Sequence, residues 1–164
     1  MTRILFTNAR LLDPAQALDK IGHVLIEDGV ILATGAGDLA PSEATETIDC
    51  KGVCLAPGLV DMRVQSADPG TEHLEDLQTL LHAAVSGGIS TIVALPDAKP
   101  VIDDASMIDS LSLRATRIGG ARLRLYGAAT VKLQGKAMAE LGMMADAGAV
   151  GFSNGTCCIM DAMV

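Results

Sequence analysis

Aromatic and basic residues are both scarce in this chain. Its 164 residues include no tryptophan, one tyrosine and two phenylalanines, and twelve basic residues face twenty acidic ones, a formal net charge of −8 at pH 7. Proteins that bind nucleic acid neutralise phosphates with Lys and Arg and often stack bases on aromatic rings. The composition therefore predicts that nucleic acid is not a partner, and that any folded core is aliphatic.

Long apolar runs are also missing. None approaches the ~20 residues that a membrane-spanning helix needs, and polar residues interrupt positions 1–10 too early for a signal peptide. The four cysteines, Cys50, Cys54, Cys157 and Cys158, lack the spacing of a secreted disulfide framework. We interpret them as reduced thiols that act as small hydrophobic side chains, with a four-cysteine zinc site as the less favoured alternative. These features predict a cytoplasmic protein that does not enter a membrane.

What the chain does contain is the apolar composition of a folded core, 49% hydrophobic residues with a mean hydropathy of +0.38. Up to about residue 55 short apolar segments alternate with turn residues. The predicted strands are 4–12, 23–27, 30–34 and 45–49. Between two of them stands Asp28-Gly29, a dipeptide that tolerates positive φ and predicts a β-hairpin. The first third of the chain therefore reads as a small β-region.

After residue 55 the pattern changes to strands that alternate with helices of about a dozen residues. The predicted strands are 59–64, 91–95, 122–127 and 150–152, and the predicted helices are 73–86, 105–118 and 136–147. Such alternation is typical of parallel βαβ units and indicates the α/β class. In a barrel of such units, function lies on the loops that follow the strands. Those loops are 65–72, 96–104, 128–135 and the residues from 153 onward.

Four sequence blocks in this second region point to one family. Residues 56–65 read Ala-Pro-Gly-Leu-Val-Asp-Met-Arg-Val-Gln, and Pro-Gly-Thr-Glu follows at 69–72. This block resembles strand one of the cyclic amidohydrolases of the dihydroorotase type, Pro-Gly-[Leu/Phe]-Val-Asp-Met-His-Val-His followed by Pro-Gly-x-Glu. Residues 84–93, 95–103 and 147–154 resemble the family's Gly-Gly, Met-Pro-Asn and strand-four blocks. Four blocks in the right order are far more specific than one short motif.

The resemblance implies a (β/α)₈ barrel of the amidohydrolase type, accompanied by a small β-sandwich. A complete barrel of this kind needs about 250 residues, so the chain is too short to hold one. We therefore expect the chain to be the N-terminal part of a longer polypeptide. Residues 1–55 would be the N-terminal part of the β-sandwich domain, and residues 56–164 the first four β/α units of the barrel.

The resemblance also assigns roles to five positions, and none of them keeps the family's residue. In the family two strand-one histidines bind zinc, a following arginine pairs with the substrate carboxylate, an asparagine holds the substrate, and a strand-four aspartate contributes to the metal site. The matching residues here are Arg63, Gln65, Ala67, Asp97 and Asn154. A guanidinium has no lone pair for a metal, and amides are poor substitutes for imidazole or carboxylate. The resemblance thus predicts no catalytic, substrate-binding or metal-binding residue and no zinc.

Other titratable residues in the strand-following loops have structural interpretations that we favour. His73 can serve as a base beside an acid, but the pattern places it in the first turn of a helix. Lys132 follows the third predicted strand of this region and could be carboxylated to bridge metals, as a lysine is in some amidohydrolases, yet a carbamate here would have no metal to bridge, so we interpret it as a loop charge. Asp103 and Asp104 are interpreted as a helix N-cap and a first-turn acid. The other two histidines lack a neighbouring ligand at metal spacing and are interpreted as structural.

Two functions remain open. The first is a non-catalytic dihydroorotase-like protein of pyrimidine biosynthesis that forms oligomers and serves as a structural or regulatory partner of aspartate carbamoyltransferase, as the resemblance implies for inactive members. The second is an active, zinc-dependent cyclic amidohydrolase that hydrolyses a cyclic amide C–N bond with ligands from strands five, six and eight. The loss at all five readable positions favours the first.

Overall fold

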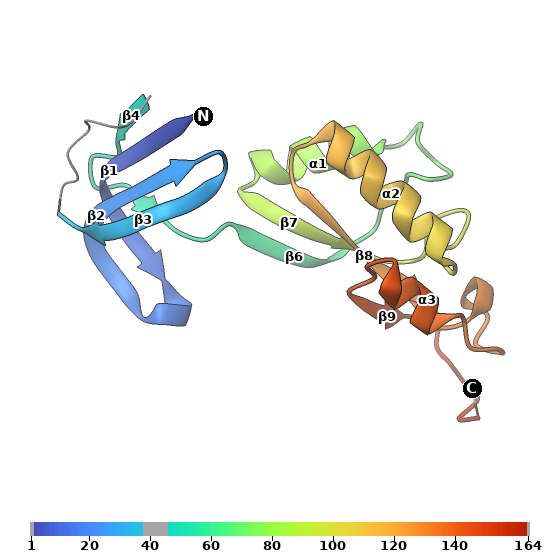
Figure 1. Ribbon diagram of the computed structural model, residues 1–164. Coiled ribbons are helices and arrows are strands. Elements are labelled where there is room, and N and C mark those ends of the chain that lie inside the picture. Colours follow the sequence, from blue (N-terminus) through green and yellow to red (C-terminus); the bar gives the residue numbers. More distant parts are fainter. Residues whose placement is uncertain (1, 38–45, 164) are drawn as a thin grey trace. The chain divides into compact units, whose positions relative to one another are not determined.

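The computed structural model describes residues 2–37 and 46–163, and the chain divides into two compact units, Met1–Pro57 and Gly58–Val164. The first unit is a β-sheet, and the second alternates strands with helices (Figure 1). The predicted α/β class is confirmed. Within the described ranges, every helix is too short or too polar to cross a bilayer.

The sheet of the first unit is built on an antiparallel meander. Its strands are β1 (Arg3–Asp13), β2 (Leu18–Glu27), β3 (Val30–Ala36), β4 (Glu46–Asp49) and β5 (Cys54–Leu55), with a 3₁₀ turn, η1 (Pro14–Gln16), between the first two. Strand β2 pairs antiparallel with β1 and β3, whereas β4 and β5 both run parallel to β1. A small core of Ala9, Leu11 and Val24 is buried in this unit.

Two local predictions in the first unit are confirmed. Asp28 and Gly29, which join β2 to β3, have φ of +48° and +82°. A two-residue hairpin turn of type I′ requires positive φ at both of its central residues. His23, one of the histidines interpreted as structural, is buried, and its Nδ1 lies 2.8 Å from the carbonyl oxygen of Gly37. It therefore serves as a hydrogen-bonding group of the sheet.

The strands of the first unit differ from prediction mainly at β2 and β5, while β1 and β3 extend one or two residues beyond their predicted ends. Strand β2 begins at Leu18, earlier than the predicted residue 23, because its first half pairs with the end of β1 beyond a β-bulge between Phe6 and Ala9. The two-residue strand β5 was not predicted. Thr45, the first residue of the predicted fourth strand, lies outside the described residues.

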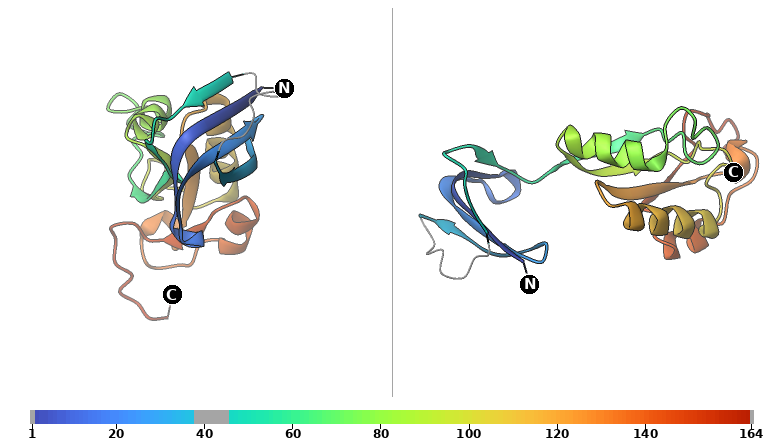
Figure 2. Two further views of the ribbon diagram at one scale, coloured as in Figure 1. Left: turned by 90° about the vertical axis from the view of Figure 1, so that its left-hand side faces the viewer. Right: turned by 90° about the horizontal axis from the view of Figure 1, so that it is seen from above.

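The second unit is a parallel sheet covered by helices. Its strands are β6 (Leu59–Val64), β7 (Ile89–Ala94), β8 (Arg122–Ala128) and β9 (Gly151–Ser153), and its helical segments are α1 (Leu77–Ser86), α2 (Ala105–Ile118), η3 (Val131–Leu133) and α3 (Leu141–Asp146). The strands pair in chain order, all parallel. Helix α1 packs against β7 and α2 against β8 (Figure 2). The unit therefore forms successive β/α units of a half-barrel, as predicted.

The core of the second unit lies between the sheet and its helices. It is aliphatic, as the scarcity of aromatic residues predicted, and its fully buried members include Leu77, Leu81, Ile92, Ile108 and Met144. Strand residues Leu123 and Leu125 contribute from β8, while the alternating Arg122 and Arg124 do not join this core. The period-two alternation of β8 therefore separates an apolar face from a basic one.

Two predicted helices are shorter than their patterns indicated. The segment predicted at 73–86 becomes helical only at Leu77, because Asp76 caps it by accepting a hydrogen bond from the Thr79 amide. The segment predicted at 136–147 is helical only over Leu141–Asp146. Its first part is held in an extended bridge between Met138 and Thr130. The backbone of residues 136–140 therefore serves the preceding loop instead of the helix.

Candidate functional site

The loops that follow the four parallel strands meet at one edge of the second unit's sheet, because parallel strands end at the same edge. Gln65 follows β6, Asp97 follows β7, Thr130 follows β8 and Asn154 follows β9. The amide of Leu95 donates to the Val64 carbonyl at 2.8 Å. The loops after β6 and β7 therefore begin side by side. The candidate site is therefore the set of these loops.

Gln65 and Asp97, two of the five altered positions, bind each other. The Nε2 of Gln65 donates a hydrogen bond to Oδ2 of Asp97 across 2.8 Å. One residue matches a zinc-binding histidine of the family and the other its substrate-holding asparagine. The side-chain amide neutralises none of the carboxylate's charge, but it satisfies one of its oxygens without a cation. The pair joins the loops after β6 and β7.

Asn154 uses its side chain to hold the neighbouring backbone. Its Oδ1 accepts from the hydroxyl of Thr130 at 2.6 Å, and its Nδ2 donates to the carbonyl oxygens of Leu133 and Cys157 at 3.3 and 3.1 Å. Thr130 is 1% exposed and also accepts from the Gly135 amide at 2.9 Å. Asn154 therefore fastens the loop after β8 to the turn after β9, a structural task for an amide at this position.

The other two altered positions offer no ligand to a metal or a substrate. Arg63 is exposed; its amide donates to Oδ1 of Asp61 at 2.9 Å, and its guanidinium makes no hydrogen bond with any described residue. Ala67 is half-buried, and its carbonyl oxygen accepts from the amide and the hydroxyl of Thr71 at 2.8 and 3.0 Å. Its methyl group has no donor for a carboxylate.

An ion pair between a buried carboxylate and a half-exposed arginine fixes the loop after β6, and the sequence analysis missed it. The Asp68 carboxylate, 1% exposed, accepts two hydrogen bonds from the Arg114 guanidinium at 2.9 and 2.6 Å and a third from the Leu77 amide at 3.1 Å. The hydrogen bond to Asp68 raises the pKa of Arg114. The partners lie 46 residues apart, so no local pattern relates them. The pair fastens this loop to helix α2.

A local contact shapes the same loop. Oε1 of Glu72 accepts from the Gly70 amide at 2.9 Å, and this bond to the charged form lowers the pKa of Glu72. Gly70 has φ of +112°, and a Cβ there would collide with the carbonyl oxygen of Lys99. Glycine is therefore required at this point, where the loops after β6 and β7 approach each other.

The structure shifts the predicted positions of three further candidates, His73, Asp103 and Asp104. His73 lies in an exposed turn before α1, so the prediction that it occupies the helix's first turn was wrong. Asp104, predicted as a first-turn acid, is the N-cap of α2: it accepts from the Ser106 hydroxyl and the Met107 amide, and these bonds lower its pKa. Asp103, predicted as the N-cap, precedes the cap by one residue and accepts from the backbone amide of Lys132 at 2.9 Å.

The residues present do not fit the zinc ion that the resemblance would supply. Gln65 and Asn154 direct their NH₂ groups into hydrogen bonds, and Arg63 offers a cation where a ligand is needed. Among the described residues no three His, Cys, Asp or Glu side chains lie close enough together to hold a metal. All four cysteines are free, and the two pairs belong to different units. This half of the barrel therefore supplies no recognisable zinc site.

The sequence comparisons all match proteins of the dihydroorotase type. The sequence model described as "Dihydro-orotase-like" matches residues 52–164. A dihydroorotase of Wolbachia sp. subsp. Drosophila simulans is 36% identical over 162 residues, 99% of this chain and 36% of that protein. A dihydroorotase of Syntrophotalea carbinolica is 39% identical over 148 residues, 90% of this chain and 34% of that protein. The chain spans about a third of the length of the curated relatives it matches.

Solved structures agree on the fold. The L-hydantoinase (dihydropyrimidinase) of Arthrobacter aurescens superposes with a TM-score of 0.76 at 28% identity, over 93% of this chain and 32% of that one. A crystal structure of a dihydroorotase superposes with a TM-score of 0.56 at 17% identity, over 93% of this chain and 42% of that one. At that identity the second match bears on the fold alone.

Proposed function

Because this chain belongs to the dihydroorotase-like family, we propose that it is a non-catalytic member that acts in pyrimidine biosynthesis as a structural or regulatory partner of aspartate carbamoyltransferase. Its place of action is the cytoplasm, where free thiols such as its exposed Cys157 and Cys158 stay reduced. The single observation that carries the loss of catalysis in this proposal is the hydrogen bond between Gln65 and Asp97, while the choice of partner follows from the family resemblance.

Gln65 and Asp97 support the loss of catalysis in two ways. First, Gln65 and Asp97 satisfy each other, so the position of a zinc-binding histidine is occupied by a donor whose NH₂ group points at a carboxylate. Second, Asp97 places a negative charge where the family holds an anionic substrate, and like charges repel strongly at close range. A site that is merely missing one ligand would not need this second change.

The residues that set the fold are retained where the catalytic residues are not, which supports a role for the shape of the barrel. A Cβ at Gly58, in the segment before β6, would collide with the side chain of Ser90 on β7. Gly70 is constrained in the same way by Lys99. Both glycines belong to the Pro-Gly motifs that carry the family resemblance. A surface kept for binding a partner depends on this framework and does not depend on zinc.

We expect the protein to co-purify with aspartate carbamoyltransferase from its native cells, in an assembly whose contacts each bury more than ~1,000 Å², as stable interfaces do. Light scattering of the transcarbamoylase from cells with and without this protein measures the effect. The expected result is a smaller particle when the protein is absent. A transcarbamoylase of unchanged mass and activity in its absence would rule out the scaffold role.

A second function has specific support and stays open as the competing proposal. The relatives that match over nearly the whole chain are named dihydroorotases, and the hydantoinase structure shares its fold at 28% identity. In this proposal the protein hydrolyses a cyclic amide with a ligand set drawn mainly from other strands of the barrel. Hydrolysis of dihydroorotate by the protein from its native cells separates the two proposals, because only the second predicts turnover.

A further inference from the structure

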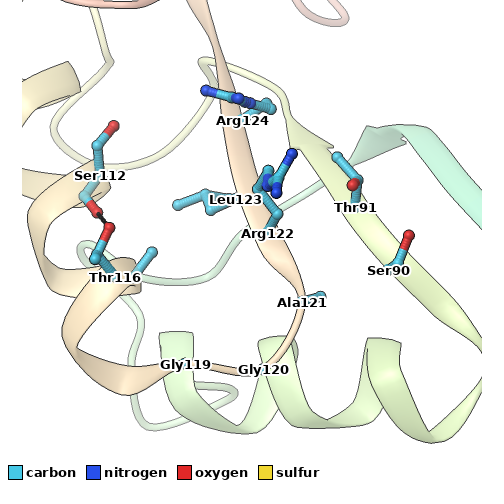
Figure 3. A pocket seen from close by; sticks show the side chains of 11 residues that line it. Ser90, Thr91, Ser112, Thr116, Gly119, Gly120, Ala121, Arg122, Leu123 and Arg124 are labelled. Atoms are coloured by element: carbon cyan, nitrogen blue, oxygen red, sulfur yellow. Dashed lines mark hydrogen bonds between the residues drawn. The ribbon is translucent and has the colours of Figure 1, made fainter. Parts of the chain in front are cut away.

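A pocket of about 560 Å³ lies at the start of strands β7 and β8, at the opposite end of the sheet from the candidate site (Figure 3). Arg122 and Arg124 project from β8, which runs between helix α2 and strand β7. The polar residues that line the pocket are Ser90, Thr91, Ser112, Thr116, Arg122 and Arg124. The pocket is thus formed by two strands and the helix that connects them.

The charge of this pocket contrasts with that of the chain. The whole sequence carries a net charge of −8, yet none of the lining residues is acidic and two are arginines. Neither guanidinium makes an ion pair or a side-chain hydrogen bond with any residue in the described ranges. Each has five N–H donors in a fork that matches the oxygens of a phosphate. The pocket therefore concentrates donors and positive charge without an internal partner.

The local backbone keeps the pocket open. Helix α2 ends at Ile118, and Gly119 and Gly120 follow it with φ angles of +77° and +88°, which allow the tight turn into β8 and leave no side chain over the pocket. Within the described ranges, strand β9 pairs with β8 over Tyr126–Ala128, and the part of β8 that carries the two arginines pairs with β7 alone. Among the hydroxyl groups that line the pocket, that of Thr116 donates to the Ser112 carbonyl at 2.9 Å and that of Ser90 to the Leu59 carbonyl at 3.4 Å.

We propose that this pocket binds a small phosphorylated molecule, whose phosphate group is held by Arg122 and Arg124 and oriented by the hydroxyl group of Thr91, which pairs in register with Arg122. Alternating residues of a strand project to the same side, so both guanidiniums can contact one dianionic group. The volume falls within the ~300–1,000 Å³ of small-molecule sites. Such a site would let a metabolite bind independently of the strand-end loops. It does not depend on whether those loops are catalytic.

The test is calorimetric titration of the protein, purified as its native cells make it, with inorganic pyrophosphate and separately with adenosine monophosphate. The test variant combines Arg122→Gln with Arg124→Gln. The matched control combines Arg117→Gln with Lys136→Gln, which removes the same two positive charges from exposed positions outside the pocket. We expect saturable binding by the wild type and the control, and affinity about tenfold or more weaker in the test variant.

Titration at about 0.15 M salt distinguishes a formed site from diffuse attraction, because screening removes the latter. A second variant, Thr91→Val, preserves both charges and the shape of the side chain and should weaken binding by roughly threefold to tenfold. The two probes separate recognition of phosphate alone from recognition of a nucleotide. Absence of binding by either probe, or equal affinity in the test variant and its charge-matched control, would overturn the proposal.

Discussion

Replacement of Arg114 by Met is expected to lower the free energy of unfolding by about 2 kcal/mol, less than for a fully buried ion pair because the Arg114 side chain is half exposed. The reason is the Asp68 carboxylate, which is 1% exposed and would lose two of its three hydrogen bonds. The Leu77 amide would remain as its only described partner. Met keeps most of the aliphatic packing of arginine, so the loss reports mainly on the stranded charge.

Urea unfolding of the purified protein measures this effect, and Arg117→Met is its control. Arg117 lies on the same helix one turn further along, is exposed, and makes no ion pair with a described residue, so its replacement should change stability by less than about 0.5 kcal/mol. Equal stability of the two variants would mean that the Asp68 pair does not hold the loop after β6 to α2.

The double substitution Arg63→His with Gln65→His is expected to leave the protein without dihydroorotase activity. Two histidines would return to strand β6, but Ala67 would still provide no donor for the substrate carboxylate and Asp97 would still carry a negative charge. Loss of one group that stabilises the transition state typically costs ~10²–10³ in rate. The Gln65 substitution also removes the hydrogen-bond donor that Asp97 now has.

Hydrolysis of dihydroorotate in the presence of Zn²⁺ is the measurement, with the Syntrophotalea carbinolica dihydroorotase assayed in parallel. A further variant that adds Ala67→Arg and Asp97→Asn shows whether the remaining positions limit the rate. Ring opening by the double variant alone would show that the rest of the site is intact, and that the roles assigned to Ala67 and Asp97 are wrong.

The elements that were predicted well are those whose signals are local. Strand β6 and helix α2 have the predicted bounds, because apolar and charged residues alternate along the first and Asp104 caps the second. The helix predicted at 136–147 failed because its first residues pair with Thr130, a contact that depends on the fold of the β8 loop. Apolar periodicity alone cannot reveal that competition between a helix and an extended bridge.

In the candidate site, too, the residues could be identified from the sequence, whereas their contacts could not. The five altered positions came from a resemblance that the family match supports, whereas their mutual contacts depend on three-dimensional structure. Gln65 and Asp97 are separated by 32 residues and Thr130 and Asn154 by 24. The arginine pocket had one visible signal, the alternation of Arg122 and Arg124 with leucines. Its hydroxyl-bearing wall on α2 emerges only when the helix packs beside β8.

The most direct test of the proposed loss of catalysis is elemental analysis of zinc in the protein purified from its native cells without chelator and dialysed. The account predicts no stoichiometric zinc, because Arg63, Gln65 and Asn154 stand where the family has two imidazoles and a carboxylate, and two of the three are committed to other hydrogen bonds. About one zinc or more per chain, retained through dialysis, would contradict the account and favour the active amidohydrolase.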